Sequence, residues 1–167
     1  MSKRPMDPDE ALSAPLYAFA LLLVAVPLLD FLQSIGALRP TNVQWRFATV
    51  GLLSGVLLTP MLGLTVAMVV AAIRQHTVLQ RILAVLSLVA ATTLSLLLIS
   101  FVLDALQVSR VVPEQGRTAF RAASVKAVLK QLSATAVLLF LGLRGWRISS
   151  WRSRRRDGQA QIPLVAR

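Results

Sequence analysis

Three long uncharged apolar runs dominate the chain, and short polar segments separate them. The runs extend from Ala11 to Leu29, from Phe47 to Ile73 and from Ile82 to Leu103, and they contain 19, 27 and 22 residues. Each run exceeds the roughly 18 residues that are typical of a helix able to cross a bilayer. The pattern therefore predicts three membrane-spanning helices.

A fourth apolar run, from Gln131 to Leu143, is shorter because Lys130 and Arg144 bound it. Its 13 residues fall short of the roughly 20 that are needed to cross about 30 Å of hydrocarbon. The long side chains of Lys126, Lys130 and Arg144 can extend along the helix and hold their charges in the headgroup region, so residues 125–148 become a usable span. An interfacial or re-entrant last segment is the alternative.

These runs predict an all-α integral membrane protein, a bundle of four transmembrane helices. Residues 11–148 form the membrane domain, between an N-terminal tail of residues 1–10 and a basic, disordered tail of residues 149–167. We expect a short surface helix at residues 114–130, before the last span. The expected spans cover about residues 11–33, 47–73, 82–103 and 125–148.

Prolines indicate where the helices begin and where they bend. Asp7 followed by Pro8 is typical of a helix start, because an aspartate caps the first turn and proline fits the first helical position. Pro15 and Pro27 each remove a backbone donor from the first span and predict kinks there. Pro60 predicts a break within the second span for the same reason.

Composition supports the membrane assignment and excludes several kinds of site. Hydrophobic residues make up 56% of the 167 positions, which is more apolar surface than a water-soluble core of this size can bury. The chain has no cysteine and a single histidine, His76, so thiolate metal sites, iron–sulfur clusters and haem held by two histidines are excluded. The sequence also lacks a nucleophile and base pair and a phosphate-binding glycine loop, so we expect no enzyme, no cofactor, no metal and no catalytic residue.

Charge predicts the location and the orientation of the chain. Arginine outnumbers lysine 15 to 3 in a chain rich in Ala, Leu and Val, a bias typical of GC-rich bacterial genomes, so we expect a bacterial cytoplasmic (inner) membrane. Of the 18 basic residues, 11 lie before the first span, in the loop of residues 74–81 or after Leu143, and the positive-inside rule therefore predicts cytoplasmic N- and C-termini. This topology accounts for the net charge of +11, and no nucleic-acid partner is expected.

Tryptophan alternates with arginine in the C-terminal tail. Tryptophan favours the membrane interface, and arginine is attracted to anionic headgroups, so the tail is predicted to bind the anionic surface of the lipid bilayer. The predicted lipid-binding residues are Trp146, Arg147, Trp151, Arg152, Arg154, Arg155 and Arg156.

Small residues at four-residue spacing predict close packing of helices. Gly51 and Gly55 form a motif of this kind in the second span, and we expect it to form a packing seam within the bundle. A dimer face is the alternative for the same pair. Ser87, Ala91 and Ser95 predict a second packing face in the third span.

One short segment occurs twice. LDFLQ at residues 29–33 ends the first span, and LDALQ at residues 103–107 ends the third. The echo suggests two copies of one helical hairpin, related as parallel repeats about an axis normal to the membrane. Because leucine is so common in this chain, chance similarity is the alternative.

Each of these segments carries an aspartate at the outer end of a span. A carboxylate in such a place is costly unless it is paired or hydrated. Arg46 and Arg121 begin the partner spans at the same expected level. We therefore predict two structural ion pairs, one from Asp30 to Arg46 and one from Asp104 to Arg121.

These observations favour a non-catalytic accessory or assembly subunit of a membrane complex, with other membrane proteins or further copies of the chain as partners. The alternative is a small proton-coupled transporter or channel that uses Asp30 and Asp104. A lipid-directed enzyme would require His76 to meet Asp30, but the expected topology places these two residues on opposite sides of the membrane.

Overall fold

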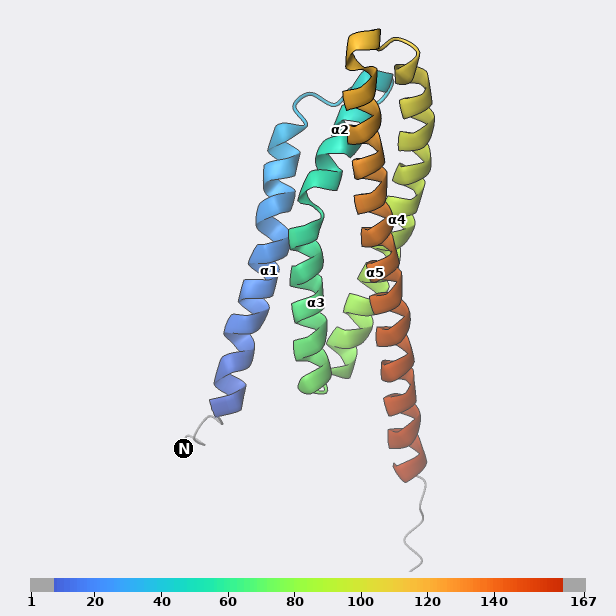
Figure 1. The fold of residues 1–167 in the computed structure, drawn as a ribbon. Coiled ribbons are helices and arrows are strands. Elements are labelled where there is room, and N and C mark those ends of the chain that lie inside the picture. The colour runs from blue at the N-terminus through green and yellow to red at the C-terminus, as the bar shows by residue number, and fades with distance from the viewer. Residues whose placement is uncertain (1–7, 161–167) are drawn as a thin grey trace, which may run out of the picture.

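The computed structural model describes the backbone of residues 8–160 and the side chains of residues 12–148, and every secondary-structure element in this part is a helix. The chain passes along the long axis in alternating directions, first as α1, then as α2 and α3, then as α4 and last as α5. α1 therefore begins and α5 ends at the same end of the molecule (Figure 1). The five helices are α1 (Pro8–Ser34), α2 (Val43–Val56), α3 (Leu58–Ile73), α4 (Thr77–Ser109) and α5 (Glu114–Ala160).

Three of these helices are long and apolar enough to cross a membrane. They are Leu12–Ser34 within α1, the whole of α4, and Glu114–Ile148 within α5. α2 and α3 reach this length only together, and they meet at a bend of 47°. The predicted all-helical fold is confirmed, with three candidate spans, or four if the bent pair crosses as one.

The bend between α2 and α3 lies beside Pro60. Proline has no backbone N–H, so it cannot donate to the carbonyl of Val56, four residues earlier. The chain leaves the helix at Leu57 and resumes it at Leu58. α1, in contrast, continues as one helix through Pro15 and Pro27, which therefore do not divide the first span.

α5 corrects two expectations at once. It runs without a break from Glu114 to Ala160, so residues 114–130 are not a separate surface helix, and the expected disordered tail is helical from residue 149 to residue 160. The start of α5 is held against the bundle because the ring of Phe120 stacks on Phe47 of α2, with ring centroids 5.2 Å apart. This contact directs the helix inward from its first turns.

Small residues allow α4 and α5 to approach closely along their length. Ser87 and Ala91, two members of the face predicted in the third span, have no exposed surface. Ala91 joins Leu94, Ala134 and Leu138 in the central apolar cluster between the two helices. Ser95 lies one turn further along, and its hydroxyl donates to the carbonyl of Ala91 at 2.8 Å.

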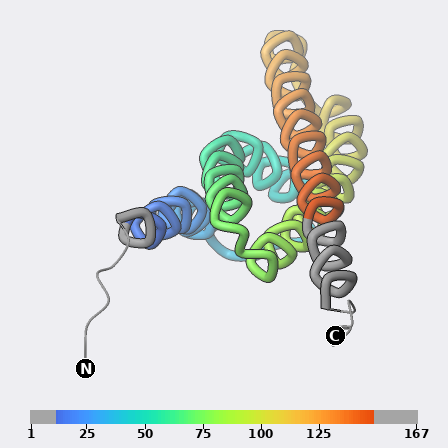
Figure 2. Tube along the Cα trace, turned by 90° about the horizontal axis from the view of Figure 1, so that it is seen from below, coloured from blue at the N-terminus to red at the C-terminus, as the bar shows by residue number. Residues whose placement is uncertain are grey.

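α1 is attached to the rest of the molecule mainly through α3. A Cβ atom added to Gly63 of α3 would lie 2.6 Å from the carbonyl oxygen of Ala20 and 2.8 Å from the side chain of Val24, so this contact requires glycine. α1 touches α3 and α2 but neither α4 nor α5 in the described part of the chain. Seen along the long axis, the helices form an open array with α1 at one edge (Figure 2).

Candidate functional site

An ion pair between Arg46 of α2 and Asp104 of α4 joins the first half of the array, which is α1 to α3, to the second half, which is α4 and α5. Nη2 of Arg46 donates to Oδ1 of Asp104 at 2.7 Å, and Nε donates to Oδ2 at 3.0 Å. This bidentate geometry is the strongest form of an arginine–carboxylate contact. Asp104 is only 3% exposed, so the pair satisfies a carboxylate that would otherwise be costly in this apolar setting.

Aromatic packing and a capped loop fix the position of Arg46. The next residue, Phe47, stacks on Phe101 of α4 with ring centroids 4.8 Å apart. Asn42 caps α2 by accepting a hydrogen bond from the backbone N–H of Trp45 at 3.1 Å. Arg46 also donates to the carbonyl of Pro40 at 3.1 Å, so the loop before α2 and the ion pair stabilise each other.

Both predicted partnerships of the aspartates are wrong. Arg46 pairs with Asp104 rather than with Asp30, and Arg121 is exposed without an ion pair among the described side chains. The physical reason is that α2 lies against α4 more extensively than against α1. The carboxylate of Asp30 is exposed at the end of α1 and has no ion pair or hydrogen bond with the described side chains, and the hydroxyl of Ser34 donates to the backbone carbonyl of Asp30 instead.

Gly51 and Gly55 do not form the expected seam within this chain. A Cβ atom at either position would meet no other atom within 4 Å. The contacts that require glycine occur at Gly63, Gly142 and Gly145, where an added Cβ would lie 2.6 to 2.7 Å from a neighbouring atom. The sequence analysis missed these three because no two of them are four residues apart.

Gly55 lies instead on the wall of a groove of about 400 Å³ between α5 and the α2–α3 bend. We call this feature the glycine groove. Lys130 of α5 also lines it, is exposed, and makes no ion pair or hydrogen bond with the described side chains. Ser54, Leu58, Met61, Ser133 and Val137 also line the groove.

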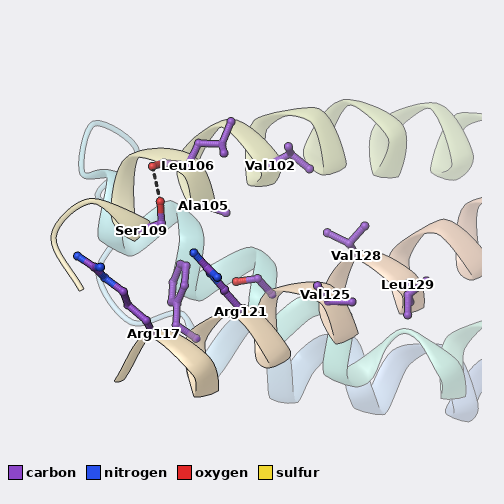
Figure 3. Close-up of a pocket in the computed structure, with 11 residues that line it drawn as sticks. Val102, Ala105, Leu106, Ser109, Arg117, Arg121, Val125, Val128 and Leu129 are labelled. Carbon is purple, nitrogen blue, oxygen red and sulfur yellow. Dashed lines mark hydrogen bonds between the residues drawn. The ribbon is translucent and has the colours of Figure 1, made fainter. Parts of the chain in front are cut away.

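A second groove, of about 570 Å³, lies between α4 and α5 (Figure 3). We call it the arginine groove, because Arg117 and Arg121 line one end of it. The Oγ atom of Ser124, also on its wall, is buried and has no hydrogen-bond partner among the described residues. Apolar side chains from both helices form the remaining walls.

Two buried glutamines are polar features that the sequence analysis overlooked. Gln131 of α5 donates from Nε2 to the carbonyl oxygen of Leu94 in α4 at 3.0 Å. Gln80, near the start of α4, is 2% exposed. An amide inside or beside an apolar run is the signal that could have identified both, because such groups serve as interhelical hydrogen bonders.

The opposite end of the array carries His76, in the turn between α3 and α4. Its Nδ1 lies 3.2 Å from the hydroxyl of Tyr17 in α1, and the two rings stack. Asp30 lies at the other end of α1, so these two residues do not share a site (Figure 1). Within the described residues there is no group of three or more His, Asp or Glu side chains that could hold a metal ion.

Two of the predicted lipid-binding residues can be placed. Trp146, which is 50% exposed, and Arg147 both lie on the outer surface of α5. One turn earlier the guanidinium of Arg144 lies 5.6 Å from the centroid of the Phe140 ring. The side chains of the other members lie outside the described part of the chain: Trp151, Arg152, Arg154, Arg155 and Arg156.

Comparisons with models of protein families, with curated proteins and with solved structures found no match for this chain. Its function must therefore be inferred from the chemistry of its own side chains. The relevant features are the ion pair between the two halves, the glycine groove with its lysine, and the arginine groove.

Proposed function

We propose that this chain is a non-catalytic subunit of a bacterial inner-membrane complex, with both termini in the cytoplasm, and that its role is to hold a neighbouring membrane helix. The observation that carries the proposal is the glycine groove, which the described chain leaves unfilled and which exposes Gly55 on one wall. Helix packing and charge support the proposal independently.

Packing supports it because Gly51 and Gly55 leave a strip of bare backbone on α2. Helices in a bilayer associate chiefly through close van der Waals contact, and small residues permit that contact. Each glycine costs a helix about 1 kcal/mol relative to alanine. A helix from another chain would use the strip, and the small residues Ser54 and Ser133 also line the groove.

Lys130 indicates the chemistry of the partner. The neighbouring Gln131 donates a hydrogen bond to the carbonyl of Leu94 in α4. Leu94 lies nine residues, or about 14 Å along the helix axis, before Leu103, where the apolar run of α4 ends, so Lys130 lies at a similar depth. A lysine at such a depth is costly unless it is paired or extends to the interface. A partner helix that carries an Asp or Glu opposite Lys130 would neutralise its charge.

The proton-coupled transporter has weaker support. Arg46 occupies both carboxylate oxygens of Asp104, whereas Asp30 lies at the end of a different helix. A shared proton path would need the two carboxylates to face one water-filled space. The bidentate pair favours a structural role for Asp104.

Affinity purification of the full chain from its native membrane in mild detergent tests the proposal. We expect a partner, or a second copy, at stoichiometric yield with the wild type, and at least a tenfold lower yield with Gly55→Leu or Lys130→Gln. Gly55→Leu fills the groove without a clash inside the chain, since no atom lies within 4 Å of its added Cβ. Lys130→Gln removes the charge that the partner carboxylate would neutralise.

Two matched controls accompany these variants. Gly116→Leu changes a helical glycine outside the groove, where an added Cβ makes only an ordinary 3.5 Å contact with Val112. Lys126→Gln removes an exposed lysine one turn from Lys130. Both should retain the partner. Equal yields from all four variants, or a wild-type chain that is purified alone, would contradict the proposal.

A further inference from the structure

The arginine groove combines an apolar trough with a positively charged end. Val102, Ala105 and Leu106 of α4 face Val125, Val128 and Leu129 of α5 across it. Arg117 and Arg121 lie at the end next to the loop between the two helices, near Ser109, while Val128 and Leu129 lie further along (Figure 3). A ligand that fits both parts must have an anionic head and an apolar tail.

The two arginines have little to neutralise their charge among the described side chains. They are four residues apart on α5 and therefore lie on the same face of the helix. Arg117 has an ion pair with Glu114 at 3.6 Å, but the Glu114 side chain is 89% exposed, so the contact is weak. Asp104, the buried acid on the neighbouring helix, already has both oxygens bound by Arg46.

Ser124 adds a neutral donor to this charged end. It lies three residues after Arg121 on the same helix, and its buried Oγ has no hydrogen-bond partner among the described residues. A buried hydroxyl without a partner is costly, and a ligand oxygen would satisfy it. Arginine guanidinium groups are favoured ligands of phosphate oxygens, and serine hydroxyls also donate to them.

We propose that the arginine groove binds one acidic phospholipid, with its phosphate between Arg117 and Arg121 and one acyl chain along the apolar walls. The volume of about 570 Å³ lies within the range of about 300–1,000 Å³ that is typical of ligand sites. The arginines lie beside the ion-paired end of α4, where its apolar run ends at Leu103, so the phosphate lies at the level of the headgroups. This site touches the glycine groove only at Leu129, which lines both, and it does not depend on a partner helix.

Native mass spectrometry of the full chain, released from nanodiscs that contain equal amounts of phosphatidylglycerol and phosphatidylcholine, tests the proposal. We expect one retained phosphatidylglycerol per wild-type chain. The double variant Arg117→Gln and Arg121→Gln should retain at least tenfold less. The matched control, Arg39→Gln with Arg110→Gln, removes two exposed arginines outside the groove and should bind as the wild type does.

A second variant tests the apolar part of the site. Val125→Trp fills the trough while it leaves both arginines in place, and we expect it to lose the lipid as well. Retention of the lipid by this variant would show surface charge attraction only, and would overturn the proposal. Equal retention by the double arginine variant, equal retention of phosphatidylcholine, or displacement of the lipid by millimolar inorganic phosphate would overturn it too.

Discussion

At the residue scale, Arg46 and Asp104 decide how the two halves of the molecule meet. The sequence correctly indicated that Asp104 needs an arginine partner, but it assigned the wrong arginine, and it wrongly predicted a partner for Asp30. Which arginine a carboxylate meets depends on how each helix leans and rotates about its own axis, and neither quantity follows from an apolar run. The repeated segments illustrate the point, because Asp104 is buried and paired while Asp30 is exposed.

This difference between the two aspartates predicts a difference between their variants. Asp104→Asn leaves Arg46 without its counter-charge, and breaking a largely buried pair is strongly destabilising. We expect the melting temperature in detergent to fall by on the order of 5 °C. Asp30→Asn, the matched change in the other copy of the segment, should leave the melting temperature unchanged. Thermal unfolding followed by circular dichroism measures both variants.

A double variant distinguishes the pair from a simple loss of charge. If Arg46 and Asp104 act together, Arg46→Gln combined with Asp104→Asn should be less destabilised than the sum of the two single variants. Additive losses of melting temperature would mean that the contact contributes nothing of its own.

At the scale of helices, the apolar runs predicted the positions of the helices well. The prolines correctly predicted the break at Pro60, but α1 is not broken at Pro15 or Pro27. The runs give the positions of α1, of α2 and α3 together, and of α4, because the length of an apolar helix is read directly from composition. The continuity of α5 was missed, and the packing of its start against α2, where Phe120 stacks on Phe47, is a contact that no apolar run reveals. The glycine contacts were assigned to the wrong residues for a similar reason, since a sequence motif does not reveal whether a second helix faces it.

The glycines therefore separate contacts inside the chain from a surface left for a partner. A Cβ atom at Gly142 would lie 2.6 Å from the side chain of Leu88, so Gly142→Leu should force α4 and α5 apart and cost about 1–3 kcal/mol. Gly51→Leu has no neighbour to displace and should leave the isolated chain unchanged or up to about 1 kcal/mol more stable.

Unfolding of the purified, partner-free chain by denaturant measures both effects on the same scale. The contrast in sign is the diagnostic feature, because a general intolerance of leucine in the helices would destabilise both variants alike. Destabilisation of the isolated chain by Gly51→Leu would show that this glycine packs within the chain after all.

At the scale of the whole molecule, the helices form an open array that is tied together at one end. The ion pair joins the beginning of α2 to the end of α4, and Phe120 at the beginning of α5 stacks on Phe47 in the same place. The loop before α2 and the loop after α4 must therefore lie at one level. The turn before α4 lies at the opposite end, beyond the bend between α2 and α3 (Figure 1).

This arrangement predicts which loops share a side of the membrane. If α2 and α3 cross the bilayer as one bent span, Leu38 and Val111 face the same compartment and Val78 faces the other. All three are more than 70% exposed, and the chain contains no cysteine, so single cysteines at these positions give a clean signal. With cytoplasmic termini, Leu38→Cys and Val111→Cys should react with a membrane-impermeant maleimide in intact cells, and Val78→Cys should react only after permeabilisation.

A re-entrant path for α2 and α3 gives a different pattern. In that case the chain returns to the side from which it entered, so Leu38 and Val78 label together while Val111 labels from the opposite side. That pattern would contradict the four-span arrangement, and it would also separate Arg46 from Asp104 by the thickness of the bilayer. Because the 2.7 Å contact between those two residues cannot exist across a membrane, labelling of Leu38 and Val111 from one side is the result that the ion pair requires.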